Sequence, residues 1–137
     1  MRAGGAEQGA RQVLSVQGRS GRLRRARQRR QRSHADDVVA ALDVLRAQVD
    51  VQSYGATPYD GHTYPLLAAR SRDWRDDLPT LVVTGGVHGY ETSGVQGALQ
   101  WLAQDFERHC GRVNLLLLPC ISPWGYETIN RWNPLAL

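Results

Sequence analysis

The chain has 137 residues and a net charge of +4, and all 17 of its basic residues are arginines. This length is enough for one ordinary domain. No stretch approaches the roughly 18 apolar residues of a membrane-spanning helix, and the N-terminus lacks the apolar core of a secretory signal, so we expect a cytoplasmic protein without membrane contact.

Charge is divided unevenly along the chain. Residues 1–32 hold ten arginines and one acidic residue, a net charge of +9, whereas the rest, with seven arginines and twelve acidic residues, carries −5. Little in residues 1–34 is apolar, so we expect a disordered arginine-rich tail. Such a tail could bind nucleic acid or an acidic partner through its charge. No aromatic side chain is interleaved for base stacking, however, which favours a solvated tail.

Residues 35–137 have the patterning of a folded domain, beginning with a helix. Apolar residues recur at helical spacing from Val38 to Val49, and this predicts a helix of about three turns. Ser33 or Asp36 is the expected N-cap, because their short oxygen-bearing side chains can accept hydrogen bonds from the first free amides.

Two short runs with strand character follow this helix. Residues 49–53 alternate between apolar and polar, residues 64–69 are mostly apolar, and the segment between them contains an Asp60-Gly61 turn signal. The pattern predicts an antiparallel hairpin with a long loop over residues 55–61. The polar residues 70–79 are expected to form a loop.

The central feature of the chain is the stretch LVVTGGVHGYETSGVQGAL, residues 81–99. It reads as a short apolar strand, a glycine-rich turn, and a helix that we expect to run from about Thr92 to His109. Gly94 and Gly97 lower helix propensity, and we expect them to let the helix lie close to a sheet.

A nearly unbroken apolar run, residues 113–118, follows this helix and predicts a buried strand. Strand, helix and buried strand in this order indicate a right-handed βαβ unit. We therefore expect an α/β fold, a three-layer α/β/α arrangement with a mixed sheet that is incomplete at the C-terminus. In this geometry His109 lies at the far end of the helix, about 27 Å from its start. The loop after Leu118 lies beside the glycine-rich turn, at the edge where ligand sites form.

The glycine-rich turn contains a histidine and a glutamate three residues apart, His88 and Glu91. An imidazole and a carboxylate at the mouth of a strand-to-helix turn make half of a catalytic zinc site, which needs three protein ligands and one open position. The alternative is a helix-capping glutamate beside an ordinary loop histidine. Other catalytic motifs are absent: the chain has no H-E-x-x-H, no G-x-G-x-x-G, no phosphate loop and no G-x-S-x-G.

GGVHGYETSG, followed later by SPWGYETINRWNP, resembles the zinc carboxypeptidase family (peptidase family M14) and, more distantly, the succinylglutamate desuccinylase and aspartoacylase enzymes. The resemblance covers about residues 51–134. It implies one zinc ion with His88 and Glu91 as its first two ligands. It also implies that Arg131 polarises the scissile carbonyl and stabilises the oxyanion, a role that suits a permanently charged guanidinium.

Several parts of that family's site have no counterpart in this sequence. The third ligand, a histidine, and the general-base glutamate come further along in the family, whereas this chain ends at Leu137. His34 and His62 are not credible replacements, and nothing places Glu127 near a metal-bound water. We therefore expect a truncated metallopeptidase that is inactive alone.

Three functions are compatible with these residues. The first is a zinc-dependent metallocarboxypeptidase-like hydrolase that releases a C-terminal amino acid from a peptide. The second is a deacylase of N-acyl amino acids from the same superfamily, which differs in residues that this chain lacks. The third is a non-catalytic α/β module whose basic tail binds nucleic acid.

Overall fold

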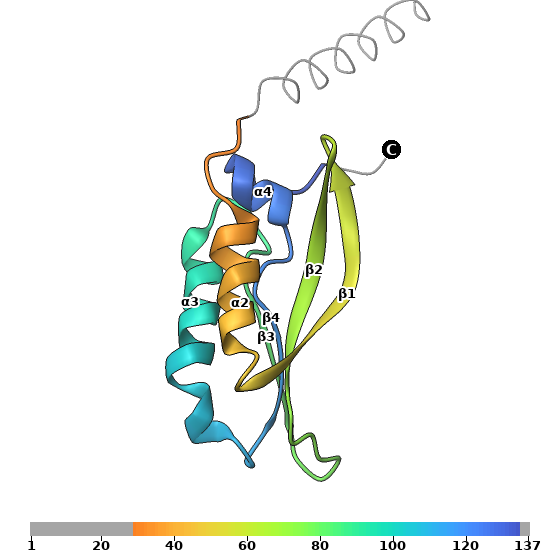
Figure 1. Cartoon of the computed structure of the whole chain (residues 1–137). Coiled ribbons are helices and arrows are strands. Elements are labelled where there is room, and N and C mark those ends of the chain that lie inside the picture. The colour runs from red at the N-terminus through yellow and green to blue at the C-terminus, as the bar shows by residue number, and fades with distance from the viewer. Residues whose placement is uncertain (1–28, 135–137) are drawn as a thin grey trace, which may run out of the picture.

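The computed structural model describes residues 29–134, and it shows a mixed four-stranded sheet of order β1-β2-β4-β3 with helices against it (Figure 1). The predicted tail lies mainly outside the described residues. In chain order the elements are η1 (Ala35–Val39), α2 (Ala40–Leu45), β1 (Val49–Tyr59), β2 (His62–Ser71), β3 (Thr80–Thr84), α3 (Thr92–Gln104), η2 (Phe106–His109), β4 (Asn114–Leu118) and α4 (Pro123–Thr128). No helix among the described residues is long and apolar enough to cross a bilayer.

The predicted first helix is present as the π-helical segment η1 followed directly by α2. The hydroxyl of Ser33 accepts a hydrogen bond from the Asp36 amide at 3.0 Å, so Ser33 satisfies one of the free amides at the helix start. The apolar face of this helix buries Val38, Leu42 and Leu45 against the sheet and α3.

The predicted hairpin is present, but its long loop is wrong. β1 and β2 pair antiparallel from Val49–Ser71 to Tyr59–His62, and they are joined by a two-residue turn at Asp60 and Gly61. Both turn residues have positive φ, 50° and 76°, as a tight turn matched to strand twist requires. Residues 54–59, which are polar and include Pro58, remain extended as the second half of β1. Most of these residues are exposed, and an edge strand tolerates proline and needs no buried face there.

The βαβ unit is confirmed. β3 and β4 pair in parallel from Thr80–Asn114 to Thr84–Leu118, and α3 connects them. α3 lies close to the turn after β3 at Gly94, as expected, but the contact requires a glycine at position 85. A Cβ on Gly85 would lie 2.6 Å from the Gly94 carbonyl oxygen, whereas one on Gly94 would lie at an ordinary 3.4 Å from the Gly86 nitrogen. The same expectation for Gly97 is wrong, because nothing lies within 4 Å of its added Cβ.

Helices α2 and α3 lie on the same side of the sheet (Figure 1), and the core is formed there. Leu115 and Leu117 of β4 are fully buried in that core, whereas Leu116 and Leu118 alternate to the opposite face and are only half-buried. Among residues 29–134 no second helical layer covers that opposite face, so the described part contains two layers of the expected α/β/α arrangement.

Candidate metal half-site

The loops that follow β3 and β4 are joined to each other at the carboxyl edge of the sheet. The Gly85 amide donates to the Leu118 carbonyl at 2.8 Å, and the Ser122 amide donates to the Gly86 carbonyl at 2.9 Å. The Ser122 hydroxyl then donates to the Val87 carbonyl at 2.8 Å. These bonds fix the glycine-rich turn beside the start of α4, as the βαβ geometry predicted.

His88 and Glu91 face each other within the glycine-rich turn. His88 Nδ1 lies 3.1 Å from Glu91 Oε1, and both side chains are accessible to solvent, with exposed fractions of 25% and 52%. Glu91 occupies the N-cap position of α3, but its side chain makes no capping hydrogen bond. Glu91 is thus the N-cap residue by position, but its carboxylate is directed to the imidazole and not to a helix amide.

Arg131 reaches the same place from the loop after α4. Its Nε lies 3.4 Å from His88 Nε2, on the side of the imidazole ring opposite Glu91. Two aromatic rings also contact the imidazole: Trp132 meets it edge-on at 4.6 Å between centroids, and Tyr90 stacks on it at 5.9 Å. The structure thus brings together the three site residues predicted from the sequence.

The pair His88 and Glu91 fits two of the positions around a zinc ion. Zinc binds imidazole nitrogen and carboxylate oxygen at about 2.0–2.2 Å, which in a tetrahedral site places two ligand atoms about 3.4 Å apart. The 3.1 Å between His88 Nδ1 and Glu91 Oε1 is close to that spacing. The described residues contain no group of three or more His, Cys, Asp or Glu side chains that could hold a metal ion. His88 and Glu91 are therefore a pair of possible metal ligands without a third among the described residues.

The remaining histidines lie away from this pair. His34 is buried, with an exposed fraction of 3%. His62 is at the turn of the hairpin, and His109 stacks on Trp101 at 5.9 Å beyond the C-terminal end of α3. None of the three forms a possible metal-binding group with His88 and Glu91 among the described residues.

The turn that carries His88 lies directly on α4. A Cβ added to Gly89 would collide with the backbone carbonyl carbon of Gly125 and the backbone nitrogen of Tyr126. The Gly89 amide also donates to the Arg131 carbonyl at 3.0 Å. Only a glycine can approach a helix backbone this closely, so Gly89 fixes the distance between the half-site and α4.

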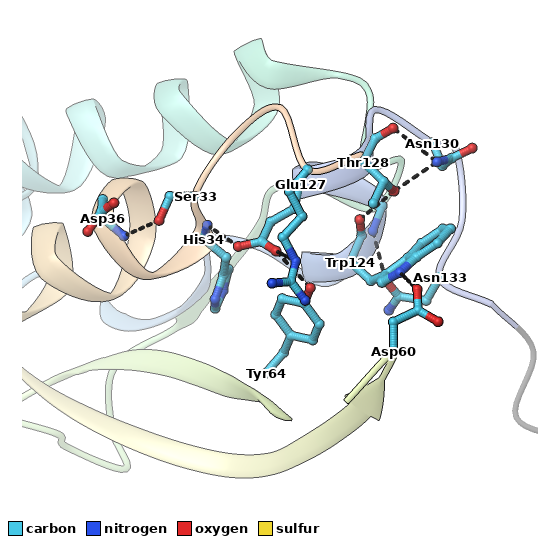
Figure 2. A network of polar contacts seen from close by, with 12 residues as sticks. Ser33, His34, Asp36, Asp60, Tyr64, Trp124, Glu127, Thr128, Asn130 and Asn133 are labelled. Carbon is cyan, nitrogen blue, oxygen red and sulfur yellow. Dashed lines mark hydrogen bonds and ion pairs between the residues drawn. The ribbon is translucent and has the colours of Figure 1, made fainter. Parts of the chain in front are cut away.

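Glu127 of α4 is the centre of a buried polar network (Figure 2). One carboxylate oxygen accepts from the Tyr64 hydroxyl at 2.7 Å and pairs with Arg30 at 2.9 Å, and the other accepts from the His34 amide at 2.9 Å. Burial lowers the pKa of His34, while burial and the hydrogen bond to Glu127 raise the pKa of Tyr64 to about 12. Glu127 therefore ties the hairpin and the N-terminal segment to α4.

Sequence reasoning missed three features of this site. Arg30 and Arg32 contact α4, but nothing in the sequence distinguishes them from the neighbouring arginines. The role of Gly89 depends on its contact with α4, which is distant in sequence. Glu127 was considered only as a base. Its place in the sequence, beside the buried aromatic residues Trp124 and Tyr126, was a signal for burial.

Comparison with known proteins gave matches among solved structures. No protein-family profile and no curated protein matches the chain. A putative metallopeptidase from Shewanella amazonensis is 30% identical with a TM-score of 0.60, over 69% of this chain and 35% of that one. A second, from Shewanella denitrificans, is 30% identical with a TM-score of 0.59, over 69% and 36%. A putative carboxypeptidase A from Shewanella denitrificans shares the fold, at 20% identity and a TM-score of 0.54, over 72% and 27%.

The chain is thus similar in sequence and fold to metallopeptidases, and it shares the carboxypeptidase fold. The resemblance to the zinc carboxypeptidase family that its motifs predicted is confirmed. The chain spans about a third of the length of the metallopeptidase structures that it matches.

Proposed function

We propose that this chain supplies the half-site of a zinc-dependent metallocarboxypeptidase-like hydrolase, with His88 and Glu91 as two ligands of one zinc ion. The observation that carries this proposal is the 3.1 Å approach of His88 Nδ1 to a glutamate that caps no helix amide. A peptide, or an N-acyl amino acid, is the substrate class, and the similarity to metallopeptidase structures favours a peptide.

Each residue at the edge of the sheet has a distinct part in this function. A bound zinc ion lowers the pKa of a water molecule to about 7 and polarises a carbonyl. His88 and Glu91 hold the ion, while Arg131 donates hydrogen bonds to the carbonyl oxygen as negative charge develops on it. Arg131 is exposed beside His88, so a substrate at this edge can reach its guanidinium. Neither Glu127, whose carboxylate is engaged in the buried network, nor another described residue supplies a base at this place.

Zinc titration of the full chain tests the metal half-site. We expect one weakly bound zinc ion per chain, and His88→Ala should weaken it by at least about tenfold, equivalent to about 1.4 kcal/mol. His62→Ala removes an exposed histidine from the hairpin turn and should leave zinc affinity unchanged. Equal zinc affinity of the wild type and His88→Ala would contradict the proposal.

Peptide hydrolysis provides a second measurement. With two ligands and no base at the half-site, the full chain with zinc should release a C-terminal amino acid no faster than the His88→Ala variant. Zinc-dependent release that disappears in His88→Ala would contradict this expectation, because it would show that the chain supplies the missing ligand and base itself.

A further inference from the structure

We propose that residues 30–34, which we call the strap, position the metal half-site, and that Arg32 is the positioning residue that connects the strap to the turn carrying His88 and Glu91. This inference rests on the proposed metal function. It assigns a role to the end of the basic segment, which the sequence alone presents as part of a solvated tail.

The strap is bound to α4 by backbone and side-chain contacts. The amides of Gln31 and Arg32 both donate to the Glu127 carbonyl, at 2.6 and 3.3 Å. The His34 amide donates to one oxygen of the Glu127 carboxylate, and Arg30 pairs with the other. Because the Glu127 carboxylate is 90% buried, these contacts are shielded from water and hold the strap in one place.

Arg32 extends from the strap to the half-site. Its Nη1 donates to the Gly89 carbonyl at 3.4 Å, and its guanidinium carbon lies 5.2 Å from the centroid of the Tyr126 ring. Gly89 is the residue next to His88 in the turn, and its amide is held by the Arg131 carbonyl. The strap therefore holds the carbonyl of Gly89, and the Arg131 loop holds its amide.

The position of this turn decides whether two ligand atoms can meet one metal ion. Glu91 is exposed and His88 is partly exposed beside the rings of Tyr90 and Trp132, so side-chain packing alone does not fix the 3.1 Å separation of Nδ1 and Oε1. The backbone between them must contribute. It is held by the packing of Gly89 on α4, by the bonds of the Gly89 and Glu91 amides to the Arg131 and His88 carbonyls, and by the contact of Arg32 with the Gly89 carbonyl. Groups that orient metal ligands in this indirect way typically contribute about 10- to 100-fold to metal affinity.

Arg32 could affect zinc affinity through its position or only through its charge, and these two explanations predict changes of opposite sign. Arg32 is a cation near a proposed cation site, so its removal would strengthen zinc binding if it acted only through its charge. If Arg32 positions the turn, its removal weakens zinc binding. The sign of the change in zinc affinity therefore distinguishes positioning from charge, provided that the variant remains folded.

The experiment compares zinc affinity in three variants of the full chain. Arg32→Gln removes the contact with Gly89, and Arg32→Lys keeps the charge and a donor. Arg29→Gln removes the same charge from an exposed residue without a hydrogen bond or ion pair to the described residues. We expect zinc affinity to fall about tenfold in Arg32→Gln, to fall less in Arg32→Lys, and to stay equal or rise in Arg29→Gln. Circular dichroism at the titration temperature verifies that each variant is folded.

Hydrogen exchange of the Gly89 amide is measured on the same variants without zinc. We expect faster exchange in Arg32→Gln than in Arg29→Gln, because the turn loses one of its anchors. If the wild type binds zinc no better than His88→Ala, the proposed function fails, and Gly89 exchange alone decides about the strap. Zinc affinity of Arg32→Gln equal to or above that of Arg29→Gln, or equal Gly89 exchange in the two variants, overturns the inference.

Discussion

The Nε atom of Arg131 lies 3.4 Å from Nε2 of His88, although the two residues are 43 positions apart in the sequence. Arginine has only donors, so Nε2 of the imidazole is the acceptor in this contact, and the proton of neutral His88 resides on Nδ1, which faces Glu91. A metal ion at Nδ1 needs that nitrogen free of its proton. The contact with Arg131 thus favours the tautomer of His88 in which Nδ1 carries the proton and cannot bind a metal ion.

The first prediction concerns this competition. Arg131→Ala should bind zinc at least as tightly as the wild type, because it frees Nε2 of His88 and removes a nearby positive charge. Arg112→Ala, which removes the same charge from an exposed residue beyond η2, is the control and should leave zinc affinity unchanged. Isothermal titration calorimetry measures both. Zinc binding that is lost in Arg131→Ala, as in His88→Ala, would mean that Arg131 supports the metal site instead of the substrate.

A pair of glycine substitutions tests the contact between the half-site turn and α4. Gly89→Ala should destabilise the fold by about 1–3 kcal/mol or more, because the added methyl group meets the backbone of α4, which cannot move aside. Gly97→Ala lies on the exposed side of α3 with free space around it, and should stabilise the fold by up to about 1 kcal/mol. Urea denaturation gives both values, and an unperturbed Gly89→Ala would show that the turn does not lie on α4.

Alkaline pH should destabilise the protein partly through Tyr64. Its pKa is raised from 10 to about 12 in the folded state, so between these values the unfolded chain has released a proton that the folded chain retains. The stabilisation from Tyr64 is therefore fully present below pH 10 and is lost as pH rises toward 12. Cys120 contributes in the same direction, since burial raises the pKa of its thiol from 9 to about 12.

Tyr64→Phe isolates the contribution of the tyrosine. At neutral pH it should lower the free energy of unfolding by about 1–3 kcal/mol, because Glu127 loses a buried donor. Above pH 10 its unfolding midpoint should fall less steeply with pH than that of the wild type. Thermal unfolding followed by circular dichroism over this pH range provides the measurement, and parallel curves for the two proteins would contradict the assignment.

The face of the sheet away from the helices predicts self-association. Val82 on β3 is 56% exposed, and it neighbours the half-buried Leu116 on that face. Exposed apolar side chains on an edge strand favour pairing between chains. Val82→Lys should reduce concentration-dependent association in analytical ultracentrifugation, whereas Val44→Lys, on the exposed side of α2, should not. A wild type that stays monomeric at all concentrations would refute this prediction.

The sequence was sufficient to predict the βαβ unit and its consequences. Apolar runs of strand length around a helix of fixed rise determine which residues lie at which edge, so His88, Glu91 and the Arg131 loop could be placed together, and His109 apart, before the structure was known. Prediction of the hairpin was less complete. The strand pattern indicated its pairing, but the alternation was too weak over residues 54–59 to show that β1 continues to the Asp60-Gly61 turn.

Only the tertiary structure reveals the contacts between segments that are distant in sequence and share no periodic pattern. The approach of Gly89 to Gly125, the burial of Glu127 and the binding of residues 30–34 to α4 depend on side chains that fill one particular space. Periodicity reports which face of an element is buried, but not what lies against it. The candidate metal ligands could therefore be predicted from the sequence, because His88 and Glu91 are close in sequence and the topology of the sheet determines the edge at which they lie. The distant contacts that hold their turn in place could not be predicted.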